Sequence, residues 1–397
     1  MNKSGNNIFL SLKKKLFILL GVFIPTSIAI TNIIIGLLLI CWILEGELKQ
    51  KIKYLRSSKW ILSIFGLIGL YVLGMFWGEI HSDAMWQFQR LALLLVFPLL
   101  ATLKIDQGTI KNSVLGFLFT TFISALVAIL INYNIICPLA EYFSFISNLP
   151  HISAFIGYNY HNILLSFSST ICLYLIIENK TKYRYLLILL FIAYAISIFT
   201  ESGRGGQLIF SLSVISYIVY YSIKYSYKFL LLLLLFLFFQ IAIYEKSEVY
   251  KKRVDYTLAT ITTGFTSNEK DINYRFLCFK ESVKRILKKP ILGYGTGSFR
   301  AIFQKEVKSQ YDFSTHRTPH NQYLYVLFEL GIFGLILLLM IFNFQIRELF
   351  NKKDGFHRVL LPVSFMIIML VDSYLFIFTL TIAYIYLYTI YANYESE

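Results

Sequence analysis

The stretch FLLLLLLFLFFQIAIY, residues 229–244, carries no charged side chain over 16 positions and is followed directly by Glu245 and Lys246. Because a bilayer core is crossed by about 20 apolar residues of helix, this stretch, extended back to residue 227, predicts a membrane span. Similar runs recur along the chain, and 57% of its 397 residues are hydrophobic, which exceeds the proportion in a soluble globular domain. The sequence therefore predicts an all-α, polytopic membrane protein.

Twelve apolar runs are present, which predicts about twelve transmembrane helices. They lie near residues 16–28, 29–45, 59–77, 86–103, 110–132, 157–177, 183–200, 206–222, 227–244, 322–345, 357–375 and 376–392. Breaks within the first pair and the last pair of runs are indicated only by Pro25 and Thr26, and by Asp372 and Ser373. Each of these two pairs therefore also fits one long tilted helix.

One long polar stretch divides the chain into three regions. We expect an N-terminal membrane domain of about nine helices at 1–244, an outer loop with interfacial helices at 245–321, and about three membrane helices at 322–397. Loops rich in Lys and Arg stay in the cytoplasm. With a cytoplasmic N-terminus, the inner loops hold 20 of the 37 Lys and Arg residues, whereas the short outer loops hold only Arg90 and Arg204. The long loop then faces outward.

The turn between the seventh and eighth spans, TESGRGGQ at 200–207, has the parts of a phosphate site. Gly203, Gly205 and Gly206 let backbone N–H groups approach an anion closely, and the next helix offers its positive N-terminus. Arg204 adds a forked, permanently charged donor. An alternative is a simple hairpin turn whose arginine reaches lipid headgroups.

The outer loop contains the pattern of a basic amphipathic helix that Arg275 opens and Pro290 ends. Its apolar residues recur at helical spacing, with lysines on the other side, which indicates a helix lying in the outer membrane interface. The lysines fit lipid contact, whereas Arg275 precedes them and could point inward. The following run GYGTGSF at 293–299 is expected to turn sharply or to pass close to a ligand.

His320 lies at the start of the tenth span, where an imidazole can exchange protons with a bound hydroxyl. The alternative is an interfacial histidine that bonds to backbone. Glu329 lies two and a half turns further along the same helix, and an intramembrane carboxylate there needs a partner such as His, Arg or Tyr. Arg90, His161 and Asp372 are further candidates at the outer ends of spans, and Arg90 could contribute to a phosphate pocket.

Several classes of partner are disfavoured. Most of the net charge of +15 is explained by topology signals beside anionic membrane lipids, so nucleic acid is not expected. The segments outside the spans contain no DxD, HExxH or CxxC pattern, and the sequence has no Walker-type phosphate loop. We therefore expect no metal, no ATP and no other cofactor.

Three motifs resemble the O-antigen ligase and polymerase (Wzy_C-like) superfamily. They are GRGGQ at 203–207, the pattern from Arg275 to the run PILGYGTGSF at 290–299, and PHNQYL at 319–324. Twelve spans with a long outer loop between the ninth and tenth also fit this family. The resemblance implies a GT-C-like membrane glycosyltransferase. The glycine after Arg204 stands where many members have threonine.

The resemblance implies an O-antigen ligase of lipopolysaccharide biosynthesis in the bacterial inner membrane, with its active site on the periplasmic side. The enzyme would transfer a glycan from undecaprenyl pyrophosphate to the lipid A core, with inversion and without metal. The arginines of the family match Arg204 and Arg275, which would stabilise the leaving pyrophosphate. Its histidine matches His320, which would act as general base. The residues expected to bind substrate are Gly203, Gly205, Gly206, Asn321, Arg90, His161 and Glu329.

Two other functions also fit the sequence. An O-antigen polymerase joins lipid-linked repeat units with the same donor, although the compact chain and its Arg/Gly/Gln turn favour a ligase. A polysaccharide or lipid transporter or flippase also fits twelve spans. The single long outer loop, a sequence without visible repeats and the clustering of charges on one face argue against a transporter.

Overall fold

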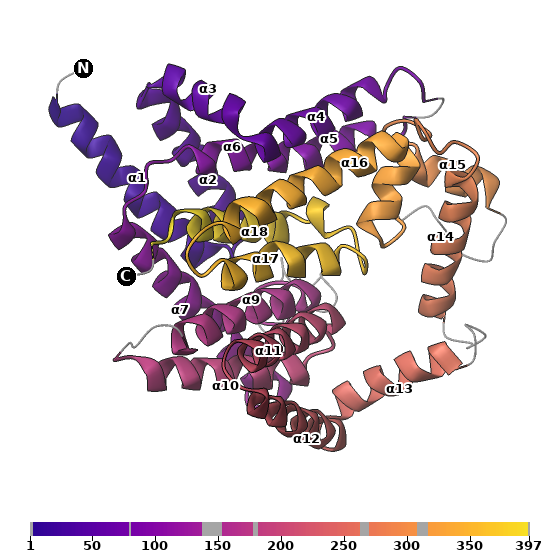
Figure 1. Cartoon of the computed structure of the whole chain (residues 1–397). Coiled ribbons are helices and arrows are strands. Elements are labelled where there is room, and N and C mark those ends of the chain that lie inside the picture. Colours follow the sequence, from indigo (N-terminus) through magenta and orange to yellow (C-terminus); the bar gives the residue numbers. More distant parts are fainter. Residues whose placement is uncertain are drawn as a thin grey trace. The chain divides into compact units, whose positions relative to one another are not determined.

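The computed structural model describes residues 3–78, 81–136, 153–177, 182–262, 270–307 and 317–395, and every regular element in these ranges is helical (Figure 1). The elements are α1 (Lys3–Phe23), α2 (Ile28–Leu44), α3 (Leu48–Ser57), α4 (Lys59–Leu73), α5 (Ala84–Leu91), η1 (Ala92–Leu95), α6 (Val96–Ala101), α7 (Gln107–Asn132), α9 (Tyr158–Ile177), α10 (Arg184–Thr200), α11 (Arg204–Lys224), η2 (Tyr227–Leu230), α12 (Leu231–Lys246), α13 (Glu248–Thr262), α14 (Lys270–Ile286), α15 (Phe299–Glu306), α16 (Gln322–Phe350), α17 (Gly355–Ile368), η3 (Tyr374–Phe376) and α18 (Phe378–Asn393). The all-α prediction is confirmed for this part of the chain.

Six helical segments among the described residues are long and apolar enough to cross a membrane, and a seventh is added if α2 and α3, bent by 113°, form one broken span. The six are Ala84–Ala101, Gln107–Asn132, Tyr158–Ile177, Arg204–Lys224, Tyr227–Lys246 and Gln322–Phe350. Helices α4, α10 and α17 are shorter and also apolar. The chain is therefore a multi-pass membrane protein, and the number of twelve spans stays a prediction.

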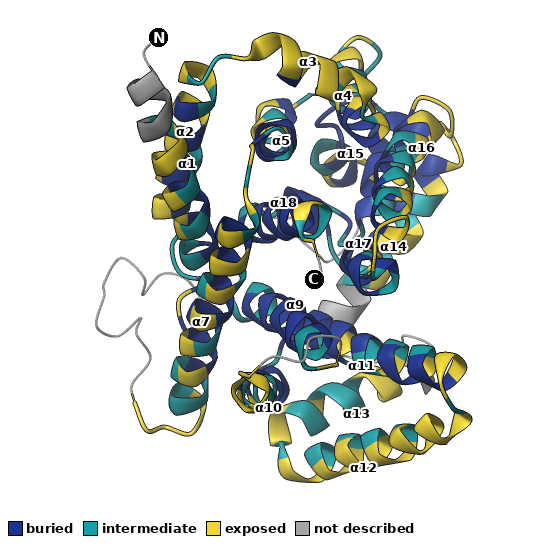
Figure 2. Ribbon diagram, turned by 60° about the vertical axis from the view of Figure 1, so that its left-hand side comes forward, coloured by how far each residue is buried: buried dark blue, intermediate teal, exposed yellow. Residues whose placement is uncertain are grey.

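The leucine-rich stretch at 229–244 is helical throughout and lies in the segment Tyr227–Lys246, formed by η2 and α12. None of its side chains is buried, and Figure 2 shows α12 exposed or half-exposed along its length. A helix that is apolar on all sides and whose side chains stay at least partly exposed is typical of a membrane span in contact with lipid.

The described chain divides into two compact units, each with its own core. The first unit comprises Met1–Lys14, Ile35–Gln107 and Thr263–Glu397, and the second comprises Lys15–Ile34 and Gly108–Thr262. In the first unit α18 is buried over most of its length. Its aromatic rings pack edge-on or stacked with those of α4, α6 and α17, as in the Tyr384–Phe365 and Tyr388–Trp60 pairs, with ring centroids 4.3 and 5.2 Å apart.

In the second unit the central helix is α9, which packs against α10 and α11. Its buried face is rich in serine, and small residues let neighbouring helices approach closely inside a membrane. These hydroxyls are also satisfied within the helix: Ser168 and Ser169 donate to the carbonyl four residues earlier at 3.0 and 2.9 Å. The polar face of α9 therefore costs little inside the bundle.

Both expected helix breaks are present. Helix α1 ends at Phe23 and α2 begins at Ile28, so Pro25 and Thr26 lie between them. Asp372 and Ser373 lie between α17 and α18. Each pair of runs is thus two helices rather than one long helix.

Two helices differ from their expected limits. Helix α14 begins at Lys270, more than one turn before Arg275, because polar residues extend a helix that apolar periodicity detects only later. Helix α16 continues to Phe350 and has a break at Gly331, where φ is +62° and ψ is −159°. A single glycine inside an apolar run gives little warning of such a break.

Candidate active site

The loop before α16 places His320 in an unusual backbone conformation. Its φ is +53°, a left-handed value that is uncommon for a residue with a Cβ. Asn321 caps α16, because its side chain accepts a hydrogen bond from the N–H of Leu324 at 3.0 Å and donates one to the carbonyl of Leu370 at 3.0 Å. These bonds hold the loop against the segment after α17, and His320 Nδ1 lies 3.2 Å from Asp372 Oδ1.

The His320–Asp372 pair has the geometry of a general base with an orienting carboxylate. The two side chains are 23% and 26% exposed, so both can be reached from outside. Burial raises the pKa of Asp372, but the hydrogen bond and charge of His320, the N–H of Ser373 and the charge of Arg275 together hold it below its ordinary value. An ionised Asp372 accepts the Nδ1–H of His320, which leaves the lone pair of the ring on Nε2.

Arg275 lies on α14 in the same unit, and its charge acts on Asp372. It is therefore within electrostatic range of the His320–Asp372 pair. The helix around it exposes Phe276 and Phe279, at 39% and 49%, while Ile286 is buried. An exposed apolar face of this kind fits a helix at a membrane interface, as the sequence predicts.

The glycine-rich loop at 293–299 packs against the break in α16. Gly293, Gly295, Gly297 and Gly331 all have positive φ, and a Cβ on any of them would come within 3.0 Å of other backbone atoms. Glu329 is fully buried, and its Oε1 accepts the N–H of Gly297 at 3.0 Å. The close approach that these glycines allow is thus to the protein's own backbone.

The backbone contacts of this loop also define the surroundings of Glu329. The N–H of Gly295 donates to the Glu329 carbonyl at 2.8 Å, and the N–H of Tyr294 donates to the Phe328 carbonyl at 2.9 Å. These bonds use carbonyl groups beside the break at Gly331, which would otherwise lack helical partners. Glu329 therefore lies inside a structural joint between the loop and α16, and a contact with substrate stays a prediction.

Arg90 belongs to a cationic cluster around α5. The guanidinium carbons of Arg90 and Arg317 lie 5.3 and 5.5 Å from the ring centre of Trp86. Asp83, whose side chain is only 6% exposed, pairs with Arg300 at 2.6 Å and with Arg317 at 3.4 Å. Asp83 thus ties α5 both to α15 and to the loop that carries His320. No local sequence pattern indicates this link, because Asp83 is more than 200 residues from both Arg300 and Arg317 along the chain.

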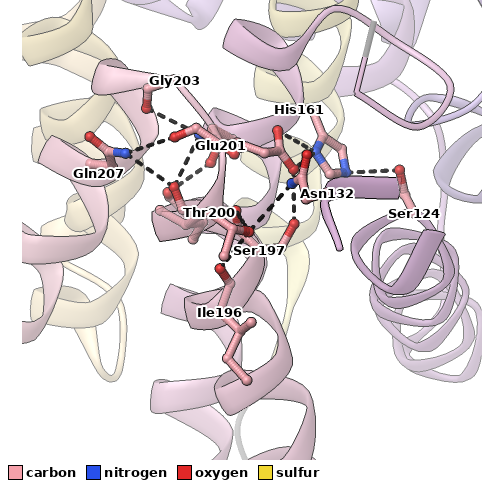
Figure 3. Close-up of polar contacts among 12 residues, drawn as sticks. Ser124, Asn132, His161, Ile196, Ser197, Thr200, Glu201, Gly203 and Gln207 are labelled. Carbon is pink, nitrogen blue, oxygen red and sulfur yellow. Dashed lines mark hydrogen bonds and ion pairs between the residues drawn. The ribbon is translucent and has the colours of Figure 1, made fainter. Parts of the chain in front are cut away.

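The turn before α11 packs tightly on α9 in the second unit (Figure 3). A Cβ on Gly203 or Gly206 would come within 3.0 Å of Asn162. The side-chain amide of Asn162 donates to the carbonyl of Gly203 at 3.2 Å, and the hydroxyl of Ser166 donates to the carbonyl of Gly206 at 2.7 Å. These two glycines are therefore required by helix packing, whether or not an anion binds at the turn.

Arg204 is the first residue of α11, so its side chain starts at the positive end of that helix. Its guanidinium carbon lies 5.9 Å from the ring centre of Tyr256 on α13. Gly205 follows it and is buried. The combination of a helix N-terminus and a half-buried arginine can bind an anionic group.

His161 lies on α9 and is fully buried. Its Nδ1 is 2.9 Å from Glu201 Oε1, and its Nε2 is 2.9 Å from the hydroxyl of Ser124 on α7 (Figure 3). The hydroxyl of Ser197 also donates to Glu201 Oε1 at 2.9 Å. His161 thus links α9 to two neighbouring segments, α7 and the turn after α10.

The predicted site residues fall into two groups. Arg275, His320, Asn321, Glu329 and Arg90 lie in the first unit. The second unit holds His161, Gly203, Arg204, Gly205 and Gly206. The charge of Arg275 acts on Asp372, the partner of His320, whereas the convergence of Arg204, Arg275 and His320 in one site stays a prediction. Across the described ranges, no group of three His, Cys, Asp or Glu side chains could hold a metal ion.

The described fold is that of a multi-pass, all-helical membrane protein, and its first unit holds a histidine paired with a carboxylate on which an arginine acts. Residues 186–339 match the Wzy_C family, described as O-antigen ligase. The match contains Arg204, Arg275 and His320, so the resemblance inferred from the motifs is confirmed over this segment. The family covers ligase- and polymerase-type glycan transfer and supports an enzyme that uses lipid-linked glycans. A comparison with curated proteins found no match.

Proposed function

We propose that the protein is an O-antigen ligase that transfers a glycan from undecaprenyl pyrophosphate to the lipid A core. The reaction takes place at the periplasmic face of the bacterial inner membrane. The observation that carries the proposal is the His320–Asp372 pair at 3.2 Å, within the electrostatic range of Arg275. A base with an orienting carboxylate can activate an acceptor hydroxyl, and a cation can stabilise the charge of a leaving pyrophosphate.

In the proposed reaction, Nε2 of His320 takes the proton of an acceptor hydroxyl. The acceptor oxygen forms a bond to the anomeric carbon of the donor sugar, while the bond from that carbon to the pyrophosphate oxygen breaks. The pyrophosphate leaves with the electron pair, and attack from the opposite face inverts the anomeric centre. Asp372 stabilises the imidazolium that forms.

Arg204 and Arg275 stabilise the charge that develops on the leaving pyrophosphate. Guanidinium groups suit this task because they stay ionised and bind phosphate oxygens through two N–H groups. The helix N-terminus at Arg204 adds a partial positive charge. The activated donor supplies the driving force, so the proposal includes no ATP and no metal.

An apolar hollow in the second unit supports a lipid-linked donor. It has a volume of about 1310 Å³ and is lined mainly by side chains of α10, α11 and α12. Thr200, four residues before Arg204, lines it, as do Lys246 and Ser247 after the leucine-rich stretch. The hollow follows α10 from Arg184 to Thr200, and a prenyl chain bound with its polar end at Thr200 would present that end beside the turn of Arg204.

Transfer by the purified protein tests the proposal. Reconstituted protein, a polyprenyl-pyrophosphate-linked glycan and lipid A core should give a glycosylated core without ATP or an ion gradient. If the glycosylated core formed only in the presence of an ion gradient, the result would instead indicate a transporter. No product under any condition would contradict the proposal.

An O-antigen polymerase is the second candidate, because the matched family covers both reactions. Deletion of the gene separates the two functions when surface polysaccharide is run on a gel. Loss of every capped core indicates a ligase. Survival of cores capped with a single repeat unit indicates a polymerase.

A further inference from the structure

We propose that His161 and Glu201 are positioning residues for Arg204 and do not themselves touch the substrate. This inference rests on the proposed function, in which Arg204 binds the pyrophosphate of the donor. It assigns a role to the buried polar network at the centre of the second unit, which the proposed reaction does not use.

Burial separates this network from any substrate. The side chains of His161 and Glu201 are 1% and 3% exposed, and Ser124 is fully buried. Both ring nitrogens of His161 are engaged, one by Glu201 and the other by Ser124. The order Ser–His–Glu also occurs in hydrolases, but a serine that no substrate can reach is not a nucleophile.

The network fixes the turn that carries Arg204. Glu201 directly follows α10, and its carboxylate is held by His161 on α9 and by Ser197 one turn earlier. Arg204 is three residues further on, so the two Cα atoms are at most about 11 Å apart. Movement of the Glu201 carboxylate would therefore rotate the start of α11, and with it the fork of Arg204.

The energetics favour a positioning role over simple stabilisation. A buried ionisable pair is costly in a membrane bundle, and apolar side chains of the same size would hold the helices together at least as well. A directed hydrogen bond sets one geometry, whereas apolar packing tolerates small rotations. A guanidinium fork that must meet two phosphate oxygens depends on that geometry.

Binding of a polyprenyl pyrophosphate to the purified full-length protein in lipid nanodiscs tests this inference. His161→Asn keeps an amide nitrogen near the Nδ1 position and should bind the probe nearly as tightly as wild type. His161→Gln places its amide near Nε2 instead and loses the Glu201 contact, so we expect Kd to rise about tenfold. Tyr194→Phe is the control, because it removes another buried hydroxyl bond of the same bundle, to the Leu118 carbonyl at 2.6 Å.

A mutant cycle with Arg204→Lys shows whether the network acts through Arg204. In that background His161→Gln should weaken binding by much less than tenfold, since the fork is already lost. Glu201→Leu is the second route to the same loss if His161→Gln fails to accumulate, because leucine offers no acceptor to His161 or Ser197. Equal binding by wild type, His161→Gln and Glu201→Leu overturns this inference alone. An undiminished effect of His161→Gln in the Arg204→Lys background also overturns it. A wild-type protein that does not bind the probe overturns the proposed function and this inference with it.

Discussion

The loop of His320 and the turn of Arg204 carry two of the three proposed catalytic residues, and they are built differently. His320 has a left-handed backbone and a partly exposed side chain that pairs with one carboxylate. The turn of Arg204 rests on a buried network and on glycines that touch α9. One region presents a reactive group, whereas the other holds a charge in place.

This comparison also separates the roles of residue types within each motif. The glycines of the Arg204 turn allow close approach to Asn162, and those of the separate loop at 293–299 allow close approach to the backbone of α16, of Gly78 and of Ala84. In the proposed function, the charged and ionisable residues provide the chemistry. A glycine-rich motif beside an arginine or histidine is therefore not by itself a ligand site.

The largest expected effect is on the reactive side of the comparison. His320→Ala removes the general base and Arg275→Ala removes a charge from the leaving group, so each should lower the transfer rate by about 10²–10⁴-fold. The protein should still insert and accumulate. Lys280→Ala on the same helix is the matched control, because Lys280 is exposed. Near wild-type transfer by either variant would remove that residue from the mechanism.

Asp372→Asn should have the next largest effect, because it removes the charge that orients and stabilises His320. We expect a fall in transfer of about 10–100-fold. The lowered pKa of Asp372 means that the carboxylate is ionised at neutral pH, and its stabilising effect is lost only as pH falls through that value. Transfer measured from about pH 6 to 8 should therefore show no titration of Asp372. Full activity in Asp372→Asn would contradict the orienting role.

The glycine contacts should affect the folded protein rather than the chemistry. Gly206→Ala forces a Cβ against the backbone of Asn162, and we expect a loss of about 1–3 kcal/mol in stability. Thermal unfolding of the detergent-solubilised protein measures it. Gly36→Ala is the control, since no atom lies within 4 Å of its added Cβ. Equal unfolding temperatures for the two variants would show that the turn is not tightly packed.

The smallest effect is expected at the cationic cluster. The side chain of Arg317 is 41% exposed, and its pair with Asp83 is 3.4 Å long, so the pair contributes at most about 1 kcal/mol. Arg317→Ala should therefore lower transfer by less than about fivefold. Arg300→Ala should cost more, because its pair with Asp83 is shorter and less exposed. The reverse order would mean that Arg317 contacts substrate.

Much of the local structure follows from the sequence. Apolar runs predict helices, and Pro25 and Asp372 mark real breaks between them. The motif residues Arg204, Arg275 and His320 lie in the segment that matches the Wzy_C family. Local hydrophobicity and turn chemistry determine these features, so they can be predicted without a fold.

Long-range partners are different, because nothing local encodes them. Asp372 is 52 residues from His320 along the chain, and Asp83 is 217 residues from Arg300. The sequence predicts that His161 binds substrate, yet its contacts with Glu201 and Ser124 depend on how α7, α9 and α10 pack. The break in α16 likewise depends on a loop that arrives from another part of the chain.

The leucine-rich helix α12 has a consequence for how a long-chain lipid could enter the second unit. No residue of α12 is buried, although its side chains line one wall of the hollow. Its polar links include the Gln240 amide to Ser211 at 3.2 Å and the Tyr250 hydroxyl to Gln240 at 2.8 Å. In the proposed function, α12 is therefore the wall that a long-chain lipid would have to pass to reach the hollow from the bilayer.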